Sequence, residues 1–258
     1  MKLVMPLLEL QHCTVSFGGL VAVDDFSLAV KPGELVGLIG PNGAGKTTVF
    51  NMISGILPPS GGRMEFLEQD LRHLRPYERN RIGIARTFQS IRLFHGLSAF
   101  DHVRVALHSK LSQGFWTSVL KPAVFQKEER WAHERAEELL ELFGLSRWKN
   151  EPAVSLPYGA QRRLEMVRAL ASGPRLLLLD EPAAGTNPRE KSELMGLIVR
   201  VRKEFDLTII VIEHDMKVVM GICERMLVLD FGVTIAEGPP EAIQRNPKVI
   251  EAYLGEET

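Results

Sequence analysis

The sequence predicts an α/β layer fold with a helical insertion near its middle, and three observations support this fold class. Short strand-like runs dominate the first 40 residues. From Leu93 to about Leu170 the pattern becomes helical and polar, a composition shift that indicates an inserted helical subdomain. After residue 175 apolar runs again alternate with helical segments, which is typical of a layered sheet.

The first elements follow from turn signals. Strand-like runs at 7–17, 26–30 and 34–40 are separated by "FGGL" and "KPGE". The start of the chain, residues 1–17, has an apolar patch that resembles a short signal peptide, but it lacks a small-residue cleavage site and better fits an edge strand. A helix closed by Gly55 is expected next, and another strand at 82–88.

One helix start and one helix face can be recognised in the middle of the chain. Ser98 and Asp101 have the spacing of a capping box. In the segment 127–144, which ends at a glycine, the apolar positions fall on one helical face. Those positions are Ala132, Ala136, Leu139, Leu140 and Phe143.

The last third alternates strands with helices. Strands are expected at 175–180, 207–215 and 225–232, with helices from Pro188 and around 216–223. The first two of these apolar runs are typical of parallel strands that are covered on both faces.

Composition narrows the class of protein. The 258 residues carry 31 Lys plus Arg and 32 Asp plus Glu, and this near-neutral balance argues against nucleic-acid binding through a basic surface. Cys13 and Cys223 lack metal-site spacing, so we expect buried free thiols. No apolar run reaches about 18 residues, so the chain is expected in the cytoplasm, with any membrane role mediated by a partner.

The strongest local motif is "GPNGAGKT" at 40–47, which matches the phosphate-binding pattern G-x-x-x-x-G-K-[ST] between a strand and a helix. Backbone N–H groups of this loop and the start of the following helix would hold phosphate oxygens. Lys46 is expected at the β- and γ-phosphates, Thr47 on Mg²⁺ and Thr48 on the α-phosphate. The loop residues expected to bind ATP are Gly40, Pro41, Asn42, Gly43, Ala44, Gly45, Lys46, Thr47 and Thr48.

The acidic pair after "LLLL" distinguishes among users of such a loop. Asp180 would hold Mg²⁺ through water, and Glu181 would polarise the attacking water. The Asn-Lys-x-Asp guanine reader of switch GTPases is absent from the sequence, and nucleotide kinases lack this acidic pair in combination with the residues downstream. ATP hydrolysis is therefore favoured.

Two further polar residues follow apolar strands, where open α/β sheets place their ligands. Gln89 closes "IARTFQ" and is a candidate for Mg²⁺ or water; His214 follows "LTIIVIE" and is a candidate for the γ-phosphate. Each alone is more typical of an ordinary strand end. Their placement together with Lys46 and Asp180 favours a catalytic site.

In this order of motifs the chain resembles the nucleotide-binding subunits of ABC transporters over nearly its whole length. The resemblance implies a P-loop NTPase fold with a mostly parallel core sheet, an N-terminal antiparallel β subdomain and an inserted helical subdomain. It implies catalytic roles for Glu181, His214, Lys46 and Gln89, with ATP and Mg²⁺ as cofactors. Phe17 matches the aromatic residue that stacks on adenine, although a hairpin core residue is an equally good interpretation.

The resemblance also implies how two subunits assemble. The signature loop of one subunit caps the ATP held by another, so that two ATPs lie in a head-to-tail dimer. The implied domains are an ATP-binding core at 1–92 and 173–240, a helical subdomain with the signature loop at 93–172, and a C-terminal extension at 241–258.

Particular phrases resemble the ATP-binding subunits of high-affinity branched-chain amino-acid importers, among them "RTFQSIRLF", "YGAQRRLEM" and "NPKVIEAYLGE". That likeness implies a second ATPase subunit, identical or different, two permease subunits, an external substrate-binding protein, and a position on the inner face of the cell membrane. Alternatives are a lipopolysaccharide-type exporter, a soluble ATPase of the same superfamily, and a module that binds ATP without hydrolysing it.

The chain departs from the family pattern Leu-Ser-Gly-Gly-Gln, of which Leu156 and Gly159 remain. Pro157, Tyr158 and Ala160 replace the serine, a glycine and the glutamine, so the partner's ATP would be met mainly by Gly159 and neighbouring N–H groups. Thr186 stands where a leucine is usual.

Two segments stay open at this point. Residues 112–125 contain Phe115, Trp116 and Phe125 around a Gly/Pro-interrupted stretch, for which we hypothesise a place near the membrane-facing side. The helical tail after Pro240 would either pack on its own subunit or help to pair two subunits.

Overall fold

The structure is a computed structural model that describes residues 5–108 and 122–254. The chain forms two compact units, one of residues 1–86 with 175–258 and one of residues 87–174. The sequence placed the corresponding boundaries at 92/93 and 172/173. We describe each unit by itself.

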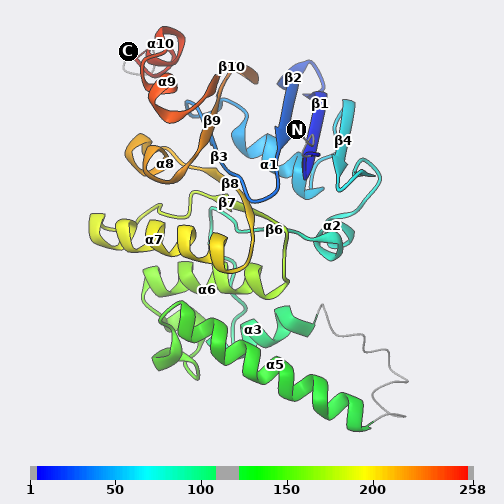
Figure 1. The fold of residues 1–258 in the computed structure, drawn as a ribbon, viewed down its shortest axis with the longest axis vertical. Helices are drawn as coiled ribbons and strands as arrows, with labels where there is room; N and C mark the ends of the chain where they lie inside the picture. The colour runs from blue at the N-terminus through cyan, green and yellow to red at the C-terminus, as the bar shows by residue number, and fades with distance from the viewer. Residues whose placement is uncertain (1–4, 109–121, 255–258) are drawn as a thin grey trace. The chain divides into compact units, whose positions relative to one another are not determined.

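A six-stranded sheet forms the centre of the first unit, with the strand order β10-β9-β3-β8-β7-β6 (Figure 1). Its strands are β3 (Leu35–Ile39), β6 (Ile84–Arg86), β7 (Leu176–Asp180), β8 (Thr208–Ile212), β9 (Arg225–Asp230) and β10 (Val233–Gly238). Neighbouring strands are parallel except for the antiparallel pair β9 and β10. Every residue of β3, β7 and β8 is buried, which explains their continuous apolar sequences.

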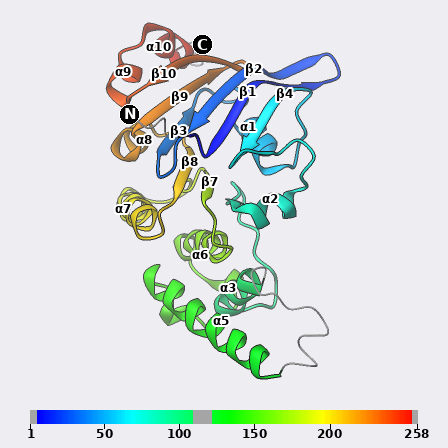
Figure 2. The same cartoon turned by 45° about the vertical axis from the view of Figure 1, so that its right-hand side comes forward.

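A second, antiparallel sheet has the order β2-β1-β4-β5 and is seen beside α1 in Figure 2. Its strands are β1 (Leu8–Phe17), β2 (Leu20–Val30), β4 (Gly61–Phe66) and β5 (Gln69–Asp70). The prediction of an edge strand at the N-terminus was wrong, because β1 lies between β2 and β4.

Glycine explains why β4 was missed. The strand begins inside the breaker-rich "LPPSGGR", a pattern that indicates a loop. Gly62 has a φ of 93°, and a Cβ atom there would lie 2.5 Å from the carbonyl oxygen of His12. Only glycine allows the two backbones to approach so closely at this point.

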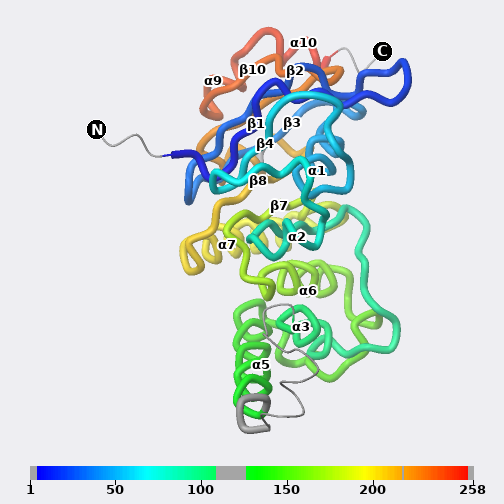
Figure 3. The backbone as a smooth tube through the Cα atoms, turned by 90° about the vertical axis from the view of Figure 1, so that its right-hand side faces the viewer, coloured from blue at the N-terminus to red at the C-terminus, as the bar shows by residue number. Residues whose placement is uncertain are grey.

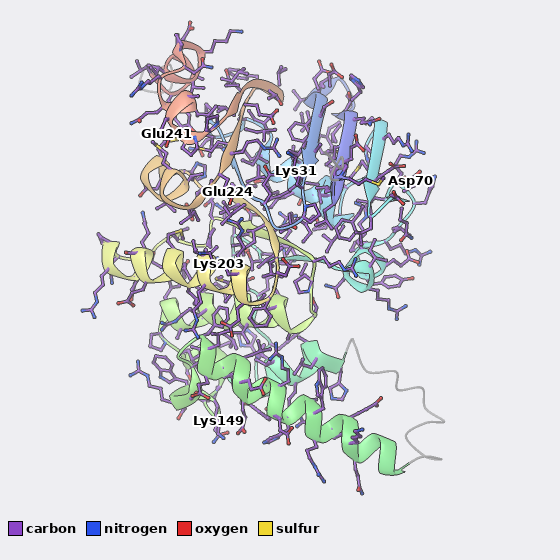
Figure 4. All side chains as sticks on the ribbon, in the orientation of Figure 1. Lys31, Asp70, Lys149, Lys203, Glu224 and Glu241 are labelled. Atoms are coloured by element: carbon purple, nitrogen blue, oxygen red, sulfur yellow. The ribbon has the colours of Figure 1, made fainter. Side chains whose placement is uncertain are left out.

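Helices complete the first unit: α1 (Lys46–Ser54), α2 (Pro76–Ile82), α7 (Pro188–Glu204), α8 (Met216–Ile222), α9 (Pro240–Gln244) and α10 (Pro247–Leu254). Helix α7 begins at Pro188, as expected, and Asn187 is its N-cap and forms a capping box with Glu190. The tail packs on its own subunit, since α9 and α10 contact β10. Charged side chains such as Lys203 and Glu224 are exposed (Figure 4).

In its described residues, the second unit contains helices α3 (Ala99–His108), α5 (Pro122–Leu142) and α6 (Tyr158–Ala171), with short 3-10 turns at 146–148 and 153–155. In Figure 3, α3 lies beside α5 and α6. The capping box is confirmed, because the hydroxyl of Ser98 and the carboxylate of Asp101 each accept a bond from the other's backbone N–H. The predicted apolar face is also confirmed, since its four residues in α5 and Phe143, which directly follows the helix, are all buried.

The hypothesis about residues 112–125 and the expectation for the two cysteines have different outcomes. Residues 112–121 lie outside the described residues, as do the side chains of 122–125, so the hypothesis about the membrane-facing side is not tested. Both cysteines are buried and free, as expected. Within the described parts of the chain, no helix combines the length and apolar character that a membrane span requires.

Candidate nucleotide-binding site

The phosphate loop connects β3 to α1, as the sequence predicted. Two of its glycines are required by the geometry. Gly40 has a φ of 146° and Gly45 a φ of 101°. A Cβ atom on Gly40 would lie 2.0 Å from the carbonyl oxygen of Leu229, and one on Gly45 would lie 2.7 Å from that of Ala22. The loop therefore adopts this path only with glycine at both positions.

Lys46 is the first residue of α1, and its side chain is buried under the loop. Its Nζ donates hydrogen bonds to the carbonyl oxygens of Gly40 and Pro41, at 2.6 and 2.5 Å. These bonds close the loop around an ammonium group, at a helix start whose dipole also favours anions. The remaining loop side chains divide into buried Pro41 and Ala44, half-buried Thr48, and exposed Asn42 and Thr47, with Gly43 also exposed.

The strand register places Asp180 and Glu181 at the same edge of the sheet as the phosphate loop. Leu38 of β3 pairs with Ile212 of β8, which pairs with Asp180 of β7. These three strands are parallel, so their carboxyl ends meet at one edge, where the loop begins two residues after Leu38. Neighbouring strands are about 4.8 Å apart, so Asp180 lies roughly 10 Å across the sheet from the loop strand.

Asp180 is buried and forms an ion pair with Arg86, whose Nη2 lies 2.8 Å from its Oδ2. Sequence reasoning assigned no role to Arg86. The only signal was its place in the phrase "RTFQ", three residues before Gln89.

Glu181 follows Asp180 with a φ of 47°, a conformation that non-glycine residues seldom adopt and that is often found at functional sites. Its N–H donates to the carbonyl oxygen of Ile212 at 2.9 Å. Its Oε1 lies 2.6 Å from Nε2 of His214. The structure thus joins two of the predicted catalytic side chains directly.

Glu213 is a buried carboxylate that sequence reasoning missed. Its Oε1 accepts a hydrogen bond from the N–H of Ala183 at 2.8 Å. Burial raises the pKa of Glu213, the bond from Ala183 opposes that rise, and the neighbouring Glu181 carboxylate adds to it. Glu213 therefore ties the segment before His214 to the segment after Glu181.

Phe17 and Gln89, two further residues predicted for the site, lie outside the strand ends described above. Phe17 is the last residue of β1 and is 51% exposed. Gln89 belongs to the second unit and lies three residues beyond the end of β6, so it does not close that strand as expected. Within its unit, its carbonyl oxygen accepts a bond from Nη2 of Arg162 at 2.6 Å.

The signature loop is the start of α6. Leu156 is extended, with φ −65° and ψ 149°, as expected before a proline. Pro157 is the N-cap, and Tyr158 and Gly159 are the first two helical residues. The hydroxyl of Tyr158 accepts bonds from Nε and Nη2 of Arg162, at 3.1 and 2.9 Å, while Ala160 is buried.

A divalent cation fits the chemistry of the donor set in the first unit. The hydroxyl of Thr47 and the carboxylate of Asp180 are hard oxygen ligands. Among the described residues, no group of three or more His, Cys, Asp or Glu is arranged so that it could hold a metal ion by itself. This set suits Mg²⁺, which proteins hold through one or two side chains together with substrate phosphates and water.

Comparisons with known proteins identify the family. Residues 23–184 match the family model "ABC transporter", and residues 233–258 match "Branched-chain amino acid ATP-binding cassette transporter". The chain is 46% identical over 251 residues to the high-affinity branched-chain amino acid transport ATP-binding protein LivG of Salmonella typhimurium, with 97% of this chain and 98% of the relative covered. It is 44% identical to the corresponding protein BraF of Pseudomonas aeruginosa, with the same coverage.

A solved structure, that of a nucleotide-free ATP-binding cassette from an ABC transporter, has a TM-score of 0.83 and 28% identity. The match covers 96% of this chain and 99% of the solved one. The chain belongs to the ATP-binding subunits of ABC transporters, and it is an ATPase.

Proposed function

We propose that this chain powers an importer for branched-chain amino acids, and that it does so as one of two ATP-binding subunits that close head to tail around two ATP molecules. The observation that carries the catalytic part is the pairing of Glu181 with His214 at the sheet edge where the phosphate loop begins. The likeness of residues 233–258 to a branched-chain amino acid cassette model supports the substrate class.

In this proposal the first unit holds the nucleotide. Phe17 stacks on the adenine, backbone N–H groups of the phosphate loop other than Pro41 bind phosphate oxygens, and Lys46 neutralises the β- and γ-phosphates. Thr48 contacts the α-phosphate. Bound Mg²⁺, held by Thr47 and through water by Asp180, would stabilise the charge that develops on the phosphates. Gln89 is proposed as a further ligand of the metal or of the water.

Glu181 acts as the base that orients and polarises the attacking water. His214 fixes the Glu181 carboxylate, and His214 also contacts the γ-phosphate. Residues 157–160 of the partner subunit would cap the ATP from the other side. There the start of α6 presents N–H groups and its dipole to the phosphate in place of a serine hydroxyl.

The partners follow from this assignment. Two permease subunits would hold the chain at the inner face of the cell membrane, and an external substrate-binding protein would deliver the amino acid. Closure of the ATP-binding pair would then move the permeases.

The test is reconstitution of the chain with its permeases, its second ATPase subunit and the binding protein in vesicles, with uptake of leucine, isoleucine and valine measured against a panel of other amino acids. We expect ATP-dependent uptake of the branched-chain group. A matched complex with Glu181→Gln should assemble and fail to transport.

Two results would contradict the proposal. Uptake that persists without this chain would exclude it as the energy source. ATP-dependent movement of lipid or lipopolysaccharide out of the vesicle leaflet, without amino-acid uptake, would favour the exporter alternative.

A further inference from the structure

Asp180, the carboxylate proposed as a metal ligand, already forms an ion pair with a cationic side chain of the protein. Arg86 Nη2 lies 2.8 Å from Asp180 Oδ2, and the two side chains are only 6% and 3% exposed. The residues lie on the neighbouring strands β6 and β7. In such a dry position the two charges interact much more strongly than an exposed pair would.

The guanidinium is fixed by α1, the helix that begins at the phosphate loop. Arg86 Nη1 donates to Oδ1 of Asn51 at 2.8 Å and to Oγ of Ser54 at 3.1 Å. The guanidinium carbon also lies 5.5 Å from the centre of the Phe50 ring. A cation held on several sides cannot move away at little cost when a second cation approaches Asp180.

We propose that Arg86 competes with the divalent cation for Asp180 and thereby lowers the metal affinity of the site. A metal ion at this carboxylate would be repelled by the fixed guanidinium charge. Nucleotide phosphates supply the negative charge that offsets this repulsion, so that the metal is retained together with nucleotide. Arg86 acts through Asp180 and is a positioning residue. The inference rests on the proposed metal role of Asp180.

The test is a Mn²⁺ titration of the full-length protein with ADP bound, in which electron paramagnetic resonance measures the free Mn²⁺. In Arg86→Met, Mn²⁺ should bind at least about tenfold more tightly than in the wild type, because a fixed unit charge near the cation is removed. In Arg86→Lys, which keeps the charge, the affinity should stay close to that of the wild type.

Arg79 provides a matched control. It is also buried, and its guanidinium donates to the carbonyl oxygens of Met52, Ile53, Leu71 and Leu74. Arg79→Met removes a buried arginine that bonds backbone carbonyls, so Mn²⁺ affinity should not change. If Arg86→Met does not fold, Arg86→Gln removes the charge, keeps a donor near Asp180 and serves for the same titration.

The metal role of Asp180 and the competition by Arg86 can be contradicted separately. If Asp180→Asn leaves Mn²⁺ binding unchanged, the proposed metal role of Asp180 is wrong. If Asp180→Asn weakens binding, but a folded Arg86→Met or Arg86→Gln binds Mn²⁺ no more tightly than the wild type, only the competition is wrong. In that case Arg86 merely orients the carboxylate.

Discussion

Glu181 Oε1 and His214 Nε2 lie 2.6 Å apart, and this contact joins the ends of two neighbouring strands. A carboxylate only accepts hydrogen bonds, so Nε2 carries the proton and donates it. The Glu181 side chain is 12% exposed and the His214 side chain is 41% exposed, so the pair lies at the margin of the sheet edge and not within the core. In the proposed mechanism the carboxylate contacts the attacking water from this position, and the imidazole holds its orientation.

Glu181→Gln should lower the rate of ATP hydrolysis about 10²- to 10⁴-fold, because the amide cannot accept a proton from the attacking water. Phosphate release by the purified protein measures the loss, and binding of a fluorescent ATP analogue should be retained. Glu193→Gln is the matched control, since Glu193 is an exposed carboxylate on α7 that pairs with Arg189. Equal loss in both variants would point to a general effect of charge.

The signature loop makes a second prediction. Gly159→Asp should abolish ATP-dependent dimer formation, because a carboxylate would face the phosphates of the partner's ATP. Gly159 lies in the first turn of α6, where an aspartate favours the helix, so the variant should remain folded. Light scattering during size-exclusion chromatography, in a Glu181→Gln background with ATP, measures the dimer.

Pro157→Ser is the companion variant, and it should leave the dimer intact or make it tighter. Pro157 is the N-cap of α6 with φ −53° and ψ 147°, without a side-chain capping bond. Serine is preferred at such a position and would restore a hydroxyl. A normal dimer in Gly159→Asp, or a lost dimer in Pro157→Ser, would refute the proposed contact.

Phe17→Ala tests the adenine contact. Loss of a stacking ring, worth about 0.5–1.5 kcal/mol, should raise KM for ATP about 2- to 13-fold and leave kcat nearly unchanged. Leu20→Ala is the control, because Leu20 pairs with Phe17 across the β1–β2 turn and is 67% exposed. If the two variants raise KM equally, Phe17 is an ordinary hairpin residue.

Most of the fold could be predicted where local patterns decide it. The glycines and Lys46 of the phosphate loop have a fixed spacing, and the buried strands β7 and β8 are continuous apolar runs. The face of α5 follows the helical period. The inner position of β1 could not be predicted, because it depends on β4, whose two glycines indicate a loop when taken alone.

Some features of the candidate site could likewise be predicted from the sequence and others could not. Glu181 and His214 could be brought together from sequence because each follows a parallel strand, and parallel strands end at a common edge. The Arg86–Asp180 ion pair and the bond from Ala183 to Glu213 could not, since each joins residues far apart in the chain whose types have no characteristic spacing. Such contacts are set by packing.

From the surroundings of His102 we predict how the free energy of unfolding of the second unit changes when the pH is lowered. Its ring is fully buried, Nε2 accepts a bond from the N–H of Phe94 at 2.8 Å, and Nδ1 donates to the carbonyl oxygen of Ser98 at 2.9 Å. The imidazole is therefore neutral, and a proton on Nε2 would face the N–H of Phe94. Burial lowers the pKa of His102 below its ordinary value, an effect that the bond to Ser98 only partly offsets.

Because the folded pKa lies below the unfolded value of about 6.5, the unfolded chain binds more protons in the interval between them. The His102 contribution to the free energy of unfolding is thus present above pH 6.5 and is lost as the pH falls through the folded pKa. Urea unfolding at pH 7.5 and 5.5 measures it through tryptophan fluorescence, since Trp116, Trp131 and Trp148 all belong to residues 87–174.

His102→Gln keeps an acceptor near the position of Nε2 and does not titrate, so it isolates this contribution. The wild type should lose more stability between pH 7.5 and 5.5 than the variant does. Glu165 in the same unit acts in the opposite direction, because burial raises its pKa and its contribution is lost as the pH rises. Only the difference between the wild type and His102→Gln therefore reports His102, and equal losses in the two proteins would show that its protonation is not linked to unfolding.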